Sequence, residues 1–238
     1  LFRSYRCGKA IVKEAQKYVE DFTAHESNCD GAVLLDSLRG VLNPKTKKME
    51  GSYHDKVQDG DMVLCRTNAP LVRECFRFLR EGRVAKIQGR NIIDGLLGTI
   101  KKINASNDDV PALVKGIAEW QTTALAKEKA KERPSDSRIQ MIQDRHDCLT
   151  YFCEEAETVN EVIERIQKIF TDSRDNAGIT LSSVHRAKGM ESKRVWLLLP
   201  REAPMPHPAA KTKRDKEQEL NLCYVAVTRA IEEFHRVR

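Results

Sequence analysis

Short apolar runs recur along the chain and predict the buried strands of an α/β sheet. Between two of these runs we expect a helix, because Pro70 occupies a favourable first-turn position and Gly82 follows the last apolar residue of a helical pattern. A strand, a helix and a second strand in this order favour a parallel sheet. The expected strands are Ala32–Leu35, Asp61–Cys65, Val84–Ile87, one beginning at Ile179, Val195–Leu199 and Phe234–Arg238.

The pattern changes between residues 91 and 174, where strand signals are nearly absent. We therefore predict one discontinuous α/β domain, residues 1–90 and 175–238, interrupted by an all-helical insertion, residues 91–174. The α/β part has two helical patterns of its own, at Gly8–Phe22 and Glu217–Ala230. Within the insertion the expected helices are Ile92–Ile103, Val110–Ala130, Ile139–Phe152 and Val159–Phe170.

Composition narrows the class of protein only a little. The net charge of +6 permits a polyanionic partner without requiring one. The seven cysteines are odd in number and form no C-x-x-C pair, so we expect reduced, mostly buried thiols and no structural zinc. No apolar run approaches the length of a membrane span, and no signal-peptide pattern opens the sequence.

The most distinctive polar stretch runs between two expected strands and reads Thr180-Leu-Ser-Ser-Val-His-Arg-Ala-Lys-Gly-Met-Glu191. Loops at strand ends in α/β sheets are where ligands bind, although a charged surface turn is the alternative. His185 has no second ligand at metal-binding spacing, so we expect it to make a hydrogen bond or a nucleic-acid contact.

Arginines stand where regular elements meet loops, at Arg6, Arg66 and Arg229. Such arginines often bind phosphate or carboxylate groups in a bidentate manner, while each alone is more often part of a surface salt bridge. The sequence contains no G-x-x-x-x-G-K-[ST] motif and no acidic pair suited to magnesium. Any nucleotide hydrolysis therefore needs machinery from outside these residues.

Together these segments resemble the motifs of superfamily 1 helicases of the UvrD/Rep type. Tyr5-Arg6-Cys7 resembles motif IV, and Val63-Leu-Cys-Arg-Thr-Asn68 resembles motif IVa. The stretch Thr180–Glu191 is similar to motif V, T-x-H-x-A-K-G-L-E in its usual form. Leu222-Cys-Tyr-Val-Ala-Val-Thr-Arg-Ala230 is similar to motif VI, L-Y-V-A-V-T-R-A. The resemblance covers essentially the whole chain and implies the second RecA-like domain of such an enzyme.

The resemblance also implies a nucleotide site. In the family the motif IV tyrosine stacks on adenine, which corresponds to Tyr5. Arg6 and Arg229 correspond to the catalytic arginines that reach the γ-phosphate. Glu191 corresponds to the residue that bonds the ribose, with Gly189 allowing close backbone approach. The cofactor implied is ATP with Mg²⁺, the metal being bound mainly by the first RecA-like domain.

The DNA-facing residues implied by the resemblance are Ser183 and His185, with Arg66 a weaker candidate. The expected partners are single-stranded DNA and the first RecA-like domain, with no membrane. The setting is the cytoplasm, at the nucleoid in a bacterial or phage system, in DNA repair or replication. Ser192 and Lys193 depart from the family pattern, in which an aromatic residue is common after the glutamate. The insertion is also shorter than the large accessory domain of well-known members.

Two alternatives remain open at this point. One is a non-catalytic helicase-like module that binds DNA or protein. The other is a subunit of a helicase–nuclease repair complex. The motifs favour the interpretation that the chain is the C-terminal half of an ATP-dependent helicase or translocase.

Overall fold

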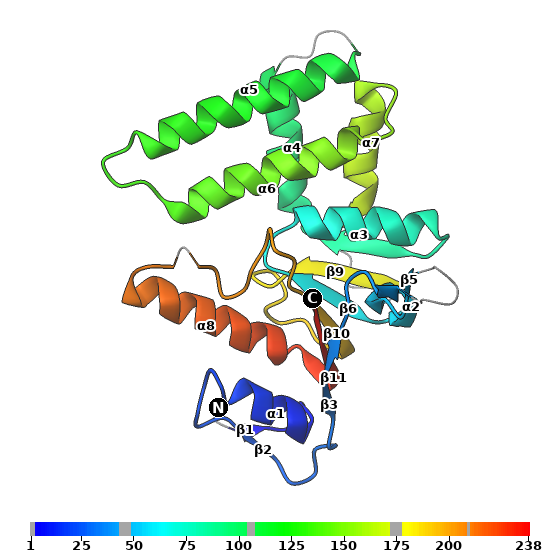
Figure 1. The fold of residues 1–238 in the computed structure, drawn as a ribbon, viewed down its shortest axis with the longest axis vertical. Helices are drawn as coiled ribbons and strands as arrows, with labels where there is room; N and C mark the ends of the chain where they lie inside the picture. The colour runs from blue at the N-terminus through cyan, green and yellow to red at the C-terminus, as the bar shows by residue number, and fades with distance from the viewer. Residues whose placement is uncertain (1–2, 43–48, 104–107, 172–177, 209) are drawn as a thin grey trace.

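The computed structural model describes residues 3–42, 49–103, 108–171, 178–208 and 210–238, and Figure 1 shows their arrangement. The strands are β1 (Arg3–Ser4), β2 (Thr23–Ala24), β3 (Ala32–Asp36), β4 (Val41–Leu42), β5 (Met49–Glu50), β6 (Met62–Cys65), β7 (Ala85–Gln88), β8 (Phe170–Thr171), β9 (Ile179–Ser183), β10 (Ser192–Leu198) and β11 (Ala230–Val237). The helices are α1 (Lys9–Ala15), α2 (Tyr53–Lys56), α3 (Ala69–Arg80), α4 (Arg90–Ile103), α5 (Val110–Lys129), α6 (Asp136–Cys153), α7 (Val159–Ile169) and α8 (Lys213–Val227).

The main sheet has seven strands in the order β3-β11-β10-β6-β9-β7-β8, and every pairing between them is parallel. This confirms the predicted parallel α/β fold with helices between strands. The strand order also shows that β6 and β7, consecutive along the chain, are separated in space by β9. Motif V therefore begins on an inner strand, with neighbours on both sides.

Alternate residues of the inner strands face two separate hydrophobic cores, as the period of two in a strand requires. Val63 and Trp196 point to the face covered by α3, whereas Leu64 and Leu197 point to the face covered by α1 and α8. Continuous apolar runs such as that of β6 are typical of strands buried on both faces. The two helical layers are visible above and to the left of the sheet in Figure 1.

The helices α4 to α7 lie between β7 and β8 in the sequence and match the four predicted helices closely. They do not form a core of their own. Leu113 of α5, Phe152 of α6 and Val162 of α7 belong to the same buried cluster as Val63 and Trp196 of the sheet. The predicted insertion therefore packs as a continuation of one face of the α/β layer, and its predicted end at residue 174 lies outside the described residues.

Several element boundaries differ from the predicted ones. The helix expected at Gly8–Phe22 ends at Ala15, and turns carry the apolar residues that follow. The helix expected at Glu217–Ala230 begins earlier, because Thr212 and Asp215 form a capping box there. β8 has only two residues and gave no sequence signal. The final strand begins at Ala230 rather than Phe234.

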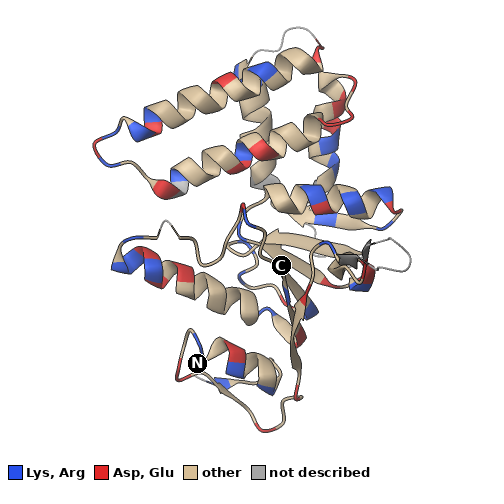
Figure 2. Ribbon diagram, viewed as in Figure 1, with Lys and Arg blue, Asp and Glu red and all other residues tan. Residues whose placement is uncertain are grey.

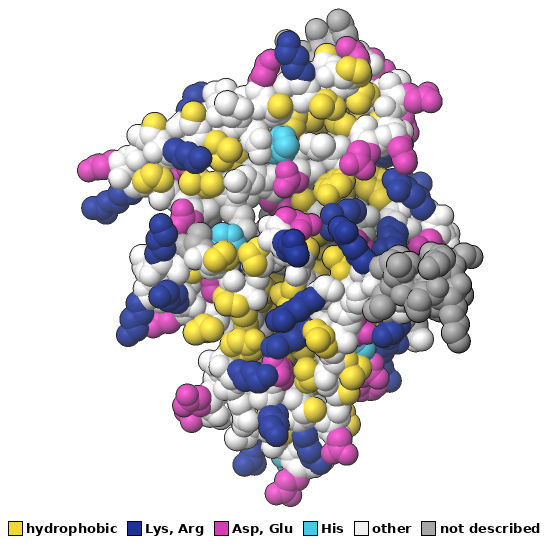
Figure 3. All heavy atoms as spheres, in the orientation of Figure 1, with side chains coloured by type: hydrophobic (Ala, Val, Ile, Leu, Met, Phe, Trp, Pro, Cys, Tyr) yellow, Lys and Arg dark blue, Asp and Glu magenta, His cyan; other side chains and the backbone are white. Residues whose placement is uncertain are grey.

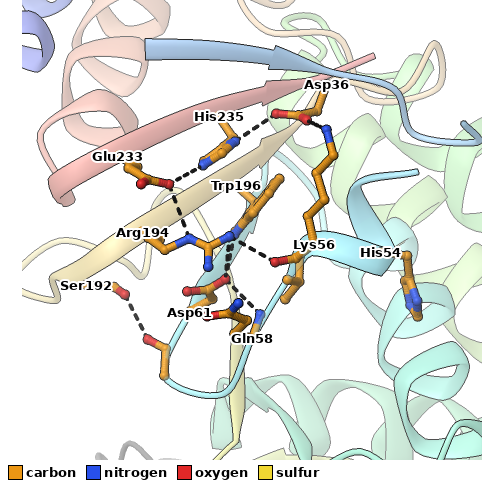
Figure 4. Close-up of polar contacts among 12 residues, drawn as sticks. Asp36, His54, Lys56, Gln58, Asp61, Ser192, Arg194, Trp196, Glu233 and His235 are labelled. Carbon is orange, nitrogen blue, oxygen red and sulfur yellow. Dashed lines mark hydrogen bonds and ion pairs between the residues drawn. The ribbon is translucent and has the colours of Figure 1, made fainter. Parts of the chain in front are cut away.

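A chain of charged and polar groups lies beside the apolar contacts where α2 meets the sheet, as Figure 4 shows. His235 lies between two carboxylates, with Nδ1 at 2.7 Å from Asp36 and Nε2 at 3.0 Å from Glu233. Its ring also stacks on Trp196 with the centroids 3.6 Å apart. Asp61 accepts a hydrogen bond of 2.8 Å from the Trp196 indole. Lys56 of α2 donates a hydrogen bond of 2.6 Å to Asp36, so this network joins α2 to the sheet.

No helix in the described part of the chain is long and apolar enough to cross a membrane. All seven cysteines are free thiols, as predicted, and all but Cys29 are buried.

The insertion is joined to the sheet layer by a buried carboxylate. Asp144 of α6 accepts hydrogen bonds from the backbone N–H groups of Asn68 and Ala69, at 2.9 and 2.7 Å, and from the Asn68 side chain at 2.8 Å. Asn68 itself makes no side-chain cap to its own helix. Asp144 therefore caps the N-terminus of α3 from another part of the chain.

We expect Asp144→Ala to lower the free energy of unfolding by about 1–3 kcal/mol, because backbone donors at the start of α3 lose a buried acceptor. Urea denaturation measures the change. The matched control is Asp147→Ala, one turn further along α6, whose side chain is half exposed. Equal losses in the two variants would contradict the capping role.

Candidate functional site

Two groups of predicted site residues lie at opposite edges of the sheet. Glu191 and Arg229 directly precede β10 and β11, at the amino ends of the strands. Arg66 and His185 follow the last residues of β6 and β9, at the carboxyl ends. Because the strands are parallel, the two groups are separated by the length of a strand. Glu191 and Arg229 therefore lie at one edge of the sheet, and Arg66 and His185 lie at the other.

Arg6 reaches the amino edge from the first segment of the chain. The turn between β1 and α1 is fixed by Ser4, whose Oγ accepts hydrogen bonds from the N–H groups of Arg6 and Cys7 at 3.3 and 3.0 Å. The Arg6 guanidinium then bonds a Glu191 carboxylate oxygen at 2.5 Å and the carbonyl of Thr228 at 2.8 Å. Three segments remote in sequence therefore meet at one point.

Arg229 lies beside this pair and is bound through backbone oxygens. Its Nε donates to the Val225 carbonyl at 2.9 Å and its Nη1 to the Met190 carbonyl at 3.0 Å. Burial lowers the pKa of Arg229, and the charge of Arg6 lowers it further. Two cations thus share one nearby carboxylate, Glu191. The local excess of positive charge suits an anion such as a polyphosphate.

The pKa of Arg6 moves in the opposite direction. Burial alone would lower it, but Cys7 and Glu191 raise the pKa of the guanidinium above its ordinary value. Glu191 therefore stabilises the charge of Arg6 directly, while Arg229 has no ion pair of its own among the described contacts. Arg229 is the arginine whose charge is less compensated.

Tyr5 presents an aromatic surface next to Arg6. Its side chain is 66% exposed, and His25 stacks on one face of its ring with the centroids 4.6 Å apart and the planes 29° from parallel. An exposed ring that is supported from behind is suited to stacking on a planar base. His25 gave no signal in the sequence, because it is brought to Tyr5 only by the pairing of β1 with β2.

Gly189 allows the loop before β10 to adopt a left-handed backbone conformation. Its φ is +88°, a left-handed value that favours glycine, and a Cβ built there would meet nothing within 4 Å. The loop from Val184 to Glu191 carries the chain from the carboxyl edge back to the amino edge. Val184 and Ala187 are fully buried and anchor the middle of this crossing to the core.

At the carboxyl edge His185 is exposed, whereas Ser183 is only 6% exposed at the end of β9. Desolvation lowers the pKa of His185, and the charge of Arg66 lowers it further. The lowered pKa favours the neutral imidazole, which can form hydrogen bonds or stack without adding charge.

Arg66 is engaged within the protein. It bonds both carboxylate oxygens of Glu219 on α8, with the shortest contact at 2.6 Å, and also donates to Gln140 on α6. Its side chain is 11% exposed and that of Glu219 is 8% exposed. A buried pair of this kind ties β6 to α8 and to the insertion. The partners lie far away in sequence, so no local pattern could have indicated them.

No group of three or more His, Cys, Asp or Glu side chains suited to a metal ion occurs in the described ranges. The residues at the amino edge fit the nucleotide part of an ATP–Mg²⁺ complex, since they offer two guanidinium groups, one carboxylate and an open aromatic ring.

The family model of the UvrD-like helicase C-terminal domain matches residues 6–234 of this chain. The chain belongs to this family. Members of the UvrD-like helicase family are ATP-dependent enzymes. A search of curated proteins gave no match. Among solved structures, the C-terminal domain of a possible DNA helicase from Lactobacillus plantarum WCFS1 is 13% identical, with 98% of this chain and 86% of that chain covered and a TM-score of 0.27. A score this low does not establish a shared fold.

We expect Arg66→Gln to raise the pKa of His185, because loss of a nearby cation favours the protonated imidazole and the remaining Glu219 carboxylate acts in the same direction. The ¹H–¹⁵N signals of the imidazole, followed against pH, measure the change. His207, which also lies in the field of Arg66, should shift the same way. Arg73→Gln, which removes another ion-paired arginine, is the control. An unchanged or lowered His185 pKa in Arg66→Gln would show that Arg66 does not act on this ring.

Proposed function

We propose that this chain is the second RecA-like domain of an ATP-dependent DNA helicase or translocase. In this proposal residues 1–90 and 175–238 form the RecA-like domain, and residues 91–174 form its insertion. A partner RecA-like domain supplies the P-loop and the groups that bind Mg²⁺. The observation that carries the proposal is the meeting of Arg6, Glu191 and Arg229 at one edge of the sheet.

The contacts of Arg6 suggest how the chain binds a nucleotide. Arg6 and Glu191 neutralise each other before binding, with half of the Glu191 side chain exposed. When a triphosphate enters, Arg6 exchanges the carboxylate for phosphate oxygens, and Glu191 becomes available to accept a ribose hydroxyl. Tyr5 stacks on the adenine with His25 behind it. One exchange of partners therefore prepares both the phosphate contact and the sugar contact.

Arg229 is the second catalytic arginine in this proposal. Its guanidinium is oriented by the Val225 and Met190 carbonyls, which accept hydrogen bonds without neutralising its charge. Such an arginine stabilises the negative charge that develops on a transferring phosphoryl group, whose charge Mg²⁺ also offsets. Because both arginines lie on a domain separate from the P-loop, hydrolysis requires the two domains to close.

DNA binding is assigned to the opposite edge. His185 is the main contact, since it is exposed and its lowered pKa favours the neutral ring, and Ser183 offers only a small surface at the strand end. We propose that Arg66 acts as a positioning residue, because Glu219 and Gln140 already occupy its guanidinium. Contacts of this type hold a single strand without reading its sequence.

The test is the ATPase activity of the full-length helicase that contains this chain. Arg6→Ala and Arg229→Ala should each lower DNA-stimulated ATP hydrolysis by about 10³-fold or more, because transition-state charge loses its partner. Single-stranded DNA binding in the absence of nucleotide should stay close to the wild-type value.

The control is Arg3→Ala, an exposed arginine on β1 three residues before Arg6. Substantial ATPase activity in both Arg6→Ala and Arg229→Ala would remove the basis for the assignment. A loss of DNA binding equal to the loss of ATPase would instead place these arginines in the DNA site.

A further inference from the structure

The turn that carries Tyr5 and Arg6 is held from behind by a segment outside the helicase motifs. Residues 25–28 follow β2 directly and form a compact turn, in which the Asn28 N–H donates to the His25 carbonyl at 3.1 Å. We call these residues the support turn. β1 and β2 pair over only two residues each, so their pairing alone gives the Arg6 turn little support. Figure 1 shows both strands beside α1, near the N-terminus.

Asn28 makes the central contact of the support turn. Its side-chain amide nitrogen donates to the carbonyl of Ser4 at 2.8 Å and to the carbonyl of Cys7 at 2.9 Å. These two carbonyls stand on either side of Tyr5 and Arg6, so one amide group spans the whole turn. Asn28 is only 8% exposed. Its two bonds use both amide protons, and a carboxylate of the same shape would offer neither.

A second contact of the support turn reaches the aromatic ring. The His25 N–H donates to the same Ser4 carbonyl at 2.8 Å, and the His25 ring stacks on Tyr5. Ser27 fixes the His25 ring, because its Oγ lies 2.7 Å from Nδ1 and its backbone N–H donates to the same nitrogen at 3.2 Å. The support turn therefore contacts both the backbone around Arg6 and the ring of Tyr5.

The overall charge of this segment does not favour an anion. Residues 3–30 contain five basic and five acidic residues, so the segment has no net charge. Figure 2 shows both signs along it, and Figure 3 shows them interspersed on its surface at the bottom of the view. Binding of a phosphate group here therefore depends on the position of the Arg6 guanidinium and not on a broad positive field.

We propose that Asn28 is a positioning residue for Arg6, and that His25 has the same role for Tyr5. The inference rests on the proposed function and extends it, because it adds residues outside the motifs to the nucleotide site. Neither residue touches the nucleotide. Asn28 fixes the backbone from which the Arg6 side chain extends, and His25 fixes the plane of the ring that stacks on adenine. A catalytic group displaced by about 1 Å loses roughly 10²-fold in rate.

The experiment measures kcat and KM for ATP, at saturating single-stranded DNA, in the full-length helicase that contains this chain. Asn28→Ala should lower kcat by roughly 10- to 100-fold, because the two carbonyls that flank Tyr5 and Arg6 are no longer held. Asn28→Asp keeps the shape and removes both donors, so it should lower kcat at least as much. The affinity for single-stranded DNA without nucleotide should stay near the wild-type value.

The matched control is Gln16→Ala. Gln16 also donates a hydrogen bond from its side-chain amide to a carbonyl, that of Phe22 at 2.8 Å, but it lies at the far end of α1 from Arg6. The kcat of this variant should stay near the wild-type value. Circular dichroism confirms that each variant is folded.

A double variant separates positioning from a general loss of stability. Arg6→Ala/Asn28→Ala should have the same kcat as Arg6→Ala alone, because a residue that acts through Arg6 then has nothing left to position. A further loss in the double variant, as large as the loss that Asn28→Ala causes alone, would show that Asn28 does not act through Arg6.

His25 supplies an independent variant that leaves the buried Asn28 contacts in place. His25→Ala should raise KM for ATP by about 2- to 10-fold with kcat little changed, because a stacked ring pair contributes to binding. Tyr5→Ala/His25→Ala should match Tyr5→Ala, since the ring that His25 supports is then absent. Additive increases in KM would overturn the role of His25.

The outcomes separate the inference from the proposed function. If Arg6→Ala loses ATPase activity while both Asn28 variants behave like Gln16→Ala, the inference is wrong and the helicase assignment stands. If Arg6→Ala and Arg229→Ala both keep substantial ATPase activity, the proposed function itself fails, and the inference fails with it.

Discussion

Glu191 is the carboxylate on which the amino edge of the sheet depends, because its charge offsets two guanidinium groups that would otherwise repel each other. It bonds Arg6 directly and acts on Arg229 through its charge. These residues come from the first segment, the motif V loop and the end of α8. The parallel pairing of β10 with β11 brings the starts of the two strands together, and Ser4 turns Arg6 toward them. Nucleotide binding would convert this internal pairing into contacts with phosphate and ribose.

The same parallel sheet sets the relation between the two proposed sites. β9 ends at the carboxyl edge, beside His185, and the loop that follows returns to the amino edge at Glu191. Its middle is anchored by buried Val184 and Ala187, while Gly189 makes the left-handed turn before Glu191. In the proposed function, a displacement of Glu191 on nucleotide binding would pass through this short, packed segment. The buried Arg66–Glu219 pair and the hydrogen bonds of Asp144 to the start of α3 join the insertion to the sheet layer.

Local pattern was sufficient to predict the inner strands, the four insertion helices and the parallel class, because burial on both faces leaves a strong apolar signal. It could not predict the place of β9 between β6 and β7, which is set by tertiary packing. The motif residues at the amino edge were predicted by resemblance, but the ion pair between Arg6 and Glu191 was not. The resemblance implied that Arg66 is a weaker candidate for a DNA contact, but it could not predict the bond to Glu219, which lies 153 residues away with no pattern to connect the two. His25 was missed for the same reason.

In the proposed function, the Val184–Glu191 loop couples the nucleotide edge to the DNA edge. The most direct measurement is the affinity of the full-length protein for a non-hydrolysable ATP analogue, with and without single-stranded DNA, in the wild type and in Gly189→Ala. We expect DNA to change the nucleotide affinity of the wild type by about 5- to 150-fold, with the reciprocal effect on DNA affinity. Alanine strains the turn at φ +88°, so the factor should fall toward one in the variant. An undiminished factor in Gly189→Ala, or no coupling in the wild type, would show that this loop does not couple the two edges.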